Sequence, residues 1–446
     1  MEIRDFIITP LLLFIVFTFA WWIRNSISDR TTRRYFIPGL AVKVLGAVSL
    51  GLIYQFYYEG GDTFNYFDKG SKFIWEAFKD SPFKAIQLIF AQGEYFAETY
   101  EYASQILYYR DLPSYFVVRI AGIFDILTLH TYSATAVLFA IFSFSGLWAM
   151  YQSLYKLYPK IHLQLAIAIF FIPSVFFWGS GILKDTLTLG ALGWSTYAFV
   201  NIFIHRKKVI SSAVIIALSF WLIYIVKIYI LLCFIPALLI WLYLIYLKRL
   251  RSAVLKVMVL PFTLALLIAG GYYAIKTIGE ENKRYNLTKL SYTAEATARW
   301  LNYVSEREEG SGYTLGDFDF SISGLIRKSP KAVWVTLFRP YLWEVKNPVM
   351  FFSAIESLFF FIFTVYVIIY SVIKRRLRLI YSHPIIFFTL LYSISFSFAI
   401  GISTYNFGTL VRYKIPMIPF YLIGLFILAY YSKSRRKFKV LEVREK

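Results

Sequence analysis

The chain has 446 residues, of which 59% are hydrophobic, 20% aromatic and 16% charged, and its formal net charge is +21 at pH 7. A soluble protein of this length could not hide so much apolar surface from water, so the composition excludes a soluble globular protein and indicates a polytopic membrane protein. The basic excess does not predict nucleic acid as a partner, because the dense Lys and Arg clusters lie between apolar runs, where they determine membrane topology.

The N-terminus "MEIRDF" lacks the net-positive start and the small-residue cleavage site of a signal peptide, so we expect the first apolar run to be a retained span. Cys233 is the single cysteine, which excludes an intrachain disulfide. The four histidines are scattered and show no metal-ligand spacing.

Apolar runs of sufficient length predict a single membrane-embedded, all-α domain with about eleven transmembrane helices, in a range of roughly 10 to 13. The predicted spans are 6–23, 38–56, 133–154, 163–180, 186–204, 209–226, 229–247, 257–276, 347–373, 383–401 and 415–431. The apolar run 114–130 is short and contains Arg119 and Asp125, so we interpret it as an interfacial or re-entrant helix; a true span remains the alternative.

With these spans the basic clusters all fall on one side, which the positive-inside rule identifies as the cytoplasm. The clusters are 24–34, 156–160, 205–208, 248–252, 374–378 and 433–439. The N-terminus then lies outside, 433–446 is a basic cytoplasmic tail, and two long loops, 57–132 and 277–346, lie outside with amphipathic interfacial helices. We therefore expect an integral inner (plasma) membrane protein whose active face is periplasmic or extracellular.

The first outer loop opens with "GGDTFNYF", in which Asp62 and Tyr66 are four residues apart. Gly60 and Gly61 allow a sharp turn and a close approach to a ligand, and a helix starting here places Asp62 and Tyr66 on one face. Asp is also a favoured N-cap residue, so a purely structural cap is the alternative.

The run "FFIPSVFFWGSGILKD" predicts a helix kinked at Pro173 and ending at Lys184 and Asp185 on the outer surface. The functional interpretation makes Lys184 a cation for a lipid phosphate, oriented by Asp185. The alternative is a snorkelling or internally compensated helix end.

Two further segments supply cations on the expected outer face. "LFRPYLWEVKNPVMFF" contains Arg339, which can grip a phosphate bidentately, and Glu344, although its aromatic residues also fit an interface belt. "STYNFGTLVRYKIPMIPF" contains Asn406, Arg412 and Tyr413 before a span with two prolines, and its basic residues run against the positive-inside bias.

Carboxylates, cations and aromatic residues on one face suit a reaction between a lipid-linked phosphate donor and a hydroxyl acceptor. On "GGDTFNY" and "NFGTLVRYKIPMIPF" the chain resembles the GT-C class of membrane glycosyltransferases, which take sugars from polyprenyl-phosphate carriers. That resemblance implies that Asp62 is the catalytic base and that a glycan or another hydroxyl compound is the acceptor. Substrate binding would then fall to Tyr66, Lys184, Asp185, Arg339, Glu344, Asn406, Arg412 and Tyr413.

Other functions stay open at this point. "RWLNYVSEREEG" places Arg299 and Gly310 at the spacing of O-antigen-type polysaccharide polymerases and ligases, which the chain also resembles. A transporter should contain ionisable residues within its spans, and Lys43 is the main exception in spans otherwise almost free of them. A non-catalytic assembly component is a further alternative. Asp62 could hold Mg²⁺ or Mn²⁺, although no spacing requires a metal, and no pattern indicates a protein partner.

Overall fold

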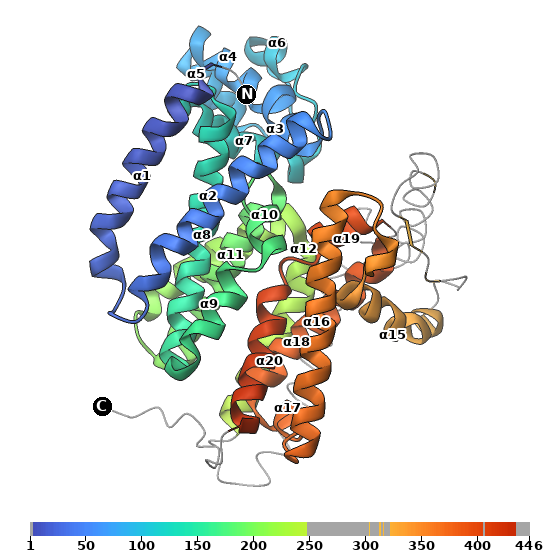
Figure 1. The fold of residues 1–446 in the computed structure, drawn as a ribbon. Coiled ribbons are helices and arrows are strands. Elements are labelled where there is room, and N and C mark those ends of the chain that lie inside the picture. The colour runs from blue at the N-terminus through green and yellow to red at the C-terminus, as the bar shows by residue number, and fades with distance from the viewer. Residues whose placement is uncertain are drawn as a thin grey trace. The chain divides into compact units, whose positions relative to one another are not determined.

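The computed structural model describes residues 3–247, 303, 312–313, 315, 322–404 and 406–433. These residues are overwhelmingly helical and no strand occurs among them, which confirms the all-α prediction. The chain forms two compact units, Met1–Leu231 and Leu232–Val440, which we call the first and second units (Figure 1). The predicted span 257–276, the basic loop 248–252 and the Arg299–Gly310 motif lie outside the described residues.

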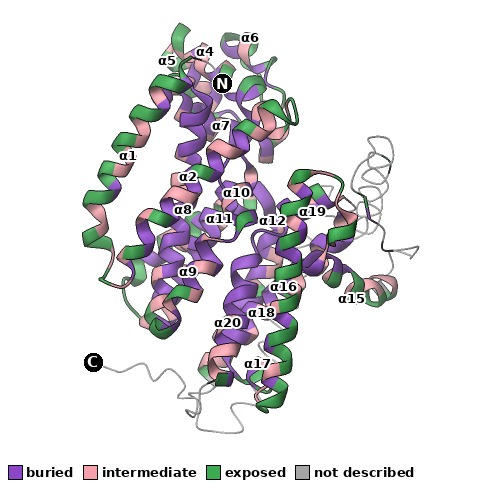
Figure 2. Ribbon diagram, viewed as in Figure 1, coloured by how far each residue is buried: buried purple, intermediate pink, exposed green. Residues whose placement is uncertain are grey.

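The first unit is built on long apolar helices, α1 (Asp5–Ile27), α2 (Arg33–Phe56), α8 (Tyr132–Leu157) and α11 (Lys184–Phe199, continued by η4, Val200–His205). α8 and α11 pack closely because glycines line their contact: a Cβ on Gly146 would lie 1.9 Å from the carbonyl oxygen of Gly190. Figure 2 shows the consequence, with α8 and α11 mostly buried and α1 exposed along much of its length.

The predicted span 163–180 forms two short helices, α9 (His162–Phe170) and α10 (Pro173–Trp178), because Pro173 starts a new helix after a break at Phe171 and Ile172. Successive residues of α2 contact successive residues of α9 and then of α10. Tyr35 bonds His162, a Cβ on Gly39 would meet Phe170, and Gly46 faces the carbonyl of Phe176. The α9–α10 pair therefore runs along α2 as two short helices in place of the expected single span.

The segment between α2 and α8 contains several short helices. They are α3 (Asp62–Tyr66), η1 (Phe67–Ser71), α4 (Lys72–Asp80), α5 (Pro82–Phe90), η2 (Ala97–Thr99), α6 (Tyr100–Ala103) and α7 (Leu112–Thr128). α5 buries Ala85 and Leu88 but exposes Phe83, Ile86 and Phe90, the pattern of a helix lying at a membrane interface. α7 occupies the run 114–130 and, at 17 residues, is shorter than the helices that qualify as candidate spans.

The second unit contains the end of α12 (Val209–Leu247), α15 (Ile322–Phe338), η6 (Leu342–Glu344), α16 (Pro348–Ile373), α17 (Leu379–Ser382), α18 (Pro384–Ser403), α19 (Phe407–Tyr413) and α20 (Ile418–Lys433). Its core includes the contacting rings of Phe234, Phe388, Tyr392 and Phe420. α19 and α20 meet at a bend of 65°.

Within the described residues, seven helices are long and apolar enough to cross a membrane, or eight if the bent α19–α20 pair is one span, fewer than the eleven or so expected. Three expected spans account for the difference. The run 163–180 is broken, 257–276 is not described, and 209–226 and 229–247 are joined in α12. Non-helical dihedrals at Lys227 (φ −151°, ψ 73°) interrupt α12 at the expected boundary between those two.

Each unit gathers its predicted cytoplasmic loops at one end. In the first, Gln152 donates to Thr32 at 3.2 Å, while His205 interacts electrostatically with Lys156, so the loops 24–34, 156–160 and 205–208 lie together. In the second, the hydroxyls of Ser371 and Ser432 lie 3.0 Å apart, which brings 374–378 to the end of α20. Within each unit, the described basic loops thus lie at one end, as the prediction that they share one side of the membrane requires. That this side is the cytoplasm stays a prediction.

Candidate functional site

The turn before α3 requires its glycines. Glu59, Gly60 and Gly61 have successive positive φ angles of 53°, 136° and 122°, and a Cβ on Gly61 would lie 2.7 Å from the Tyr54 ring. Gly61 takes the N-cap position and Asp62 is the first residue of the helix, so the carboxylate sits in the first turn rather than at the cap. Asp62 is partly exposed.

Tyr66 shares α3 with Asp62, as predicted, but its side chain is buried, and its ring lies 5.2 Å from that of Tyr108. It therefore packs α3 against the later part of the same loop. Tyr58, just before the turn, is 43% exposed, and partial desolvation, with the neighbouring Tyr54 and Tyr57 adding to the shift, raises its pKa to about 12. Its hydroxyl stays protonated at neutral pH.

Lys184 and Asp185 have different partners. The Lys184 ammonium lies 3.8 Å from the carboxylate of Asp111, which belongs to the first outer loop and follows Tyr108 by three residues. Asp185 is fully buried and pairs with Lys227, itself 6% exposed, at the break in α12. The structure thus connects Lys184 to the loop that contains Asp62, and it holds Asp185 in a buried ion pair rather than against Lys184.

A further buried cation lies in the same unit. Lys43, in α2, is 0% exposed and donates to the carbonyl oxygen of Gly179 at the end of α10. Lys43 was noted in the sequence, whereas Lys227 was missed. Its signal was a lone charge in the run "WLIYIVKIYILL", at the boundary between two expected spans.

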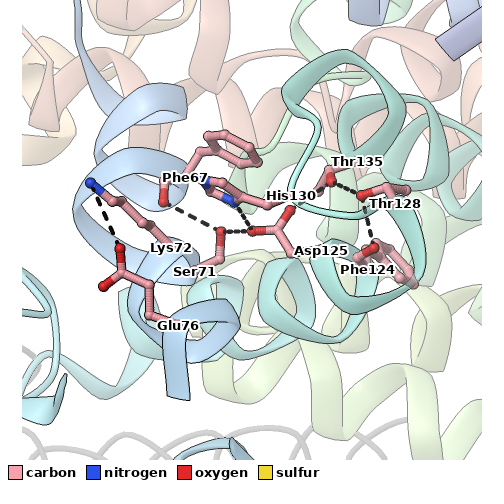
Figure 3. Close-up of polar contacts among 9 residues, drawn as sticks. All are labelled: Phe67, Ser71, Lys72, Glu76, Phe124, Asp125, Thr128, His130 and Thr135. Atoms are coloured by element: carbon pink, nitrogen blue, oxygen red, sulfur yellow. Dashed lines mark hydrogen bonds and ion pairs between the residues drawn. The ribbon is translucent and has the colours of Figure 1, made fainter. Parts of the chain in front are cut away.

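A second carboxylate, Asp125 of α7, is also fully buried and was not predicted as a site residue. Figure 3 shows its surroundings: Ser71 donates to Oδ2 at 2.5 Å, Thr135 donates to Oδ1 at 2.7 Å, and Nδ1 of His130 lies 3.1 Å from Oδ2. The His130 ring stacks on Phe67, with centroids 4.4 Å apart. The only sequence signal was a charged residue in an apolar helix five residues before a histidine.

In the second unit, Arg339 and Glu344 form a two-bond pair. Nε of Arg339 donates to Oε2 at 3.0 Å, and Nη2 donates to Oε1. The guanidinium carbon also lies 5.0 Å from the Phe407 ring centroid and 5.6 Å from those of Tyr313 and Tyr341. The pair therefore sits among aromatic rings, of which Tyr341 and Phe407 come from the two segments that the sequence predicted as sites.

The late segment joins the same cluster. Asn406 caps α19, since its Oδ1 accepts from the backbone N–H of Gly408 at 2.7 Å. Arg412 is 9% exposed and Tyr413 is partly exposed. Lys414, 1% exposed, donates to the hydroxyl of Ser357 at 3.3 Å, and Ser357 donates to the backbone carbonyl of Arg339 at 3.0 Å.

A shallow hollow of about 500 Å³ lies directly after Glu344. Its lining is apolar apart from Lys346 and Asn347, and includes Phe351 and Phe352, which are exposed on α16. The hollow thus places apolar surface next to the Arg339–Glu344 pair.

Among the described residues, no group of three or more His, Cys, Asp or Glu side chains is arranged to hold a metal ion. Mg²⁺ or Mn²⁺ at Asp62 therefore stays a prediction. The chain matches no protein-family model, no curated protein and no solved structure.

Proposed function

We propose that this membrane protein is a glycosyltransferase, which moves a sugar from a polyprenyl-phosphate donor to a glycan or other hydroxyl acceptor. The reaction takes place at the outer face of the inner (plasma) membrane and serves the assembly of cell-surface polysaccharide or glycoconjugate. The observation that carries the proposal is the cluster in the second unit, where Arg339 and Lys414 are connected through Ser357 and lie among aromatic rings. Arg412 lies on the short helix between Phe407 and Lys414.

This cluster has the properties that a lipid-linked sugar phosphate needs. Guanidinium and ammonium groups bind phosphate oxygens, and aromatic rings stack on sugar rings. The apolar hollow beside Glu344 offers a surface for a polyprenyl chain. The cluster also lies at the end of its unit opposite the basic loop 374–378, as an outward-facing site requires.

We assign the role of the base to Asp62, the first residue of α3. As the acceptor oxygen bonds to the anomeric carbon, the Asp62 carboxylate takes the hydroxyl proton. The bond from the anomeric carbon to the phosphate oxygen breaks, and its electron pair stays on the phosphate. Lys184 of the same unit, whose ammonium lies 3.8 Å from Asp111 in the first outer loop, then stabilises the charge that develops on the leaving group. A polysaccharide polymerase or ligase would use the same chemistry and stays an alternative.

Ion-coupled transport is a second candidate, because the structure buries more charge within the first unit than the sequence suggested. Lys43, Asp185 and Lys227 are all buried among apolar helices, as the residues of an ion pathway are. Proton flux into vesicles containing the reconstituted protein, recorded with a pH-sensitive dye, tests this function. Flux that Lys43→Met abolishes would favour the transporter.

Donor binding tests the transferase. Arg412→Ala should weaken binding of a polyprenyl-phosphate hexose at least about tenfold, the loss expected for one charge-assisted contact with phosphate. Arg378→Ala, the same change on an exposed arginine at the opposite end of the unit, should leave binding unchanged. Equal affinity in both variants, with both proteins monodisperse, would refute the assignment of Arg412.

A further inference from the structure

The buried Asp125 carboxylate is surrounded by hydrogen-bond donors from several elements. Ser71 comes from η1, Thr135 from α8, and His130 from the turn after α7. Thr128 adds a second layer, with its hydroxyl 2.7 Å from that of Thr135. Each of these partners can donate, so the oxygens of Asp125 act as acceptors in these contacts.

This carboxylate determines which nitrogen of His130 carries the proton. Because Asp125 accepts from Nδ1, that nitrogen is the N–H of the neutral ring, and Nε2 keeps a lone pair. One ring face is covered by Phe67 and the Nδ1 edge by Asp125, yet 14% of the side chain stays exposed. The His130 side chain is therefore not sealed from solvent.

The backbone holds this orientation. Leu129 and His130 both have a φ of 53°, a left-handed conformation that L residues seldom adopt, and the N–H of His130 bonds the carbonyl of Asp125 at 2.9 Å. Such strained residues concentrate at functional sites. A structural turn alone would be easier to build with glycine at these positions.

His130 also lies near the candidate base. Its ring stacks on Phe67, and Phe67 directly follows α3, which begins at Asp62. Asp62 and Phe67 are five residues apart in one continuous helical stretch, so His130 packs against the same stretch that begins at Asp62.

We propose that His130 is the proton-relay residue of this site, with Asp125 as its positioning residue; the inference rests on the proposed role of Asp62. After Asp62 takes the acceptor proton, water carries that proton to Nε2. The carboxylate of Asp62 is thereby restored, and the imidazolium, stabilised by Asp125, releases the proton to bulk solvent. No bond to carbon changes in this step, and one proton enters and leaves.

Buffer rescue tests the relay. In dilute buffer, His130→Gln should lower kcat by about 10²-fold, within the range of acid–base contributions, with little change in KM. Added imidazole should restore most of the lost rate, because a small base in solution replaces the missing one. His162→Gln, at the opposite end of the unit, is the control and should show no dependence on imidazole. A loss that imidazole does not restore would overturn the relay.

A substrate-free measurement separates this inference from the proposed function. In the ¹⁵N-histidine-labelled protein, the His130 resonances are those that disappear in His130→Gln. Their chemical shifts should show the Nδ1–H tautomer in the wild type, and these shifts should change in Asp125→Asn. An Nε2–H tautomer in the wild type would overturn the inference. Turnover that survives Asp62→Asn would instead refute the proposed function, whatever the tautomer.

Discussion

Neutralising one partner of the Asp185–Lys227 pair should destabilise the protein strongly. Both side chains are removed from water, at 0% and 6% exposure, so each depends on the other for compensation of its charge. Lys227→Met leaves the Asp185 carboxylate buried without this cation, and Asp185→Leu leaves the Lys227 ammonium buried without this anion. Losing one partner of a buried pair costs about 3–5 kcal/mol, which is two to four powers of ten in the folding equilibrium constant.

The double variant distinguishes this explanation from simple loss of packing. With both charges replaced by apolar side chains, no buried charge remains uncompensated, so Asp185→Leu/Lys227→Met should be more stable than either single variant. The assay is reversible unfolding in mixed detergent micelles, followed by the fluorescence of the 11 tryptophans.

An exposed pair in the same unit provides the control. Lys72 and Glu76 lie 4.0 Å apart, with 46% and 34% of their side chains exposed, so Lys72→Met should cost less than about 1 kcal/mol. If Lys227→Met costs no more than Lys72→Met, or if the two single effects add in the double variant, the reasoning is wrong.

Two further predictions concern the ends of the first unit. The hydrogen bond from Lys84 and the charge of Lys84, helped by Tyr102, hold the pKa of Asp80 below its usual 3.8. The pair therefore stabilises the fold above about pH 4 and loses this contribution as the pH falls through the lowered pKa. Carboxyl ¹³C titration should show Asp80 titrating at a higher pH in Lys84→Gln, and an unchanged titration would contradict the assignment. Separately, single cysteines at positions 62 and 206, in a chain without its native cysteine, should react with impermeant reagents from opposite sides of the membrane; labelling from one side would overturn the outward-facing site.

Much of the fold followed from local pattern. The apolar runs predicted α1, α2, α8, α16 and α18 because a span must present about 20 apolar residues whatever packs against it. Pro173 was expected to kink a helix, but the sequence did not show that the chain would break into α9 and α10 while still following α2. That outcome depends on contacts between elements more than 100 residues apart.

In the candidate site, too, local features could be predicted from the sequence, whereas contacts between distant segments could not. The Gly60–Gly61 turn and the helix start at Asp62 could be predicted because glycine and acidic residues have local preferences. The pairing of Asp185 with Lys227 could not, because the partners are 42 residues apart and sequence spacing does not define packing between helices. The same holds for Asp125, which is bonded by Ser71 from 54 residues earlier. Asn406, expected in substrate binding, uses its side chain to cap α19.

We propose above that the chain transfers a sugar from a polyprenyl-phosphate donor with Asp62 as the base. The most direct measurement is turnover by the purified protein in vesicles that contain a radiolabelled polyprenyl-phosphate hexose and an added glycan acceptor. We expect transfer by the wild type and by the control variant Asp68→Asn, which changes an exposed carboxylate in the same helical stretch. Asp62→Asn should lose at least about 10²-fold in turnover and retain donor binding. Near-normal turnover by a correctly folded Asp62→Asn protein would contradict the proposed role of Asp62.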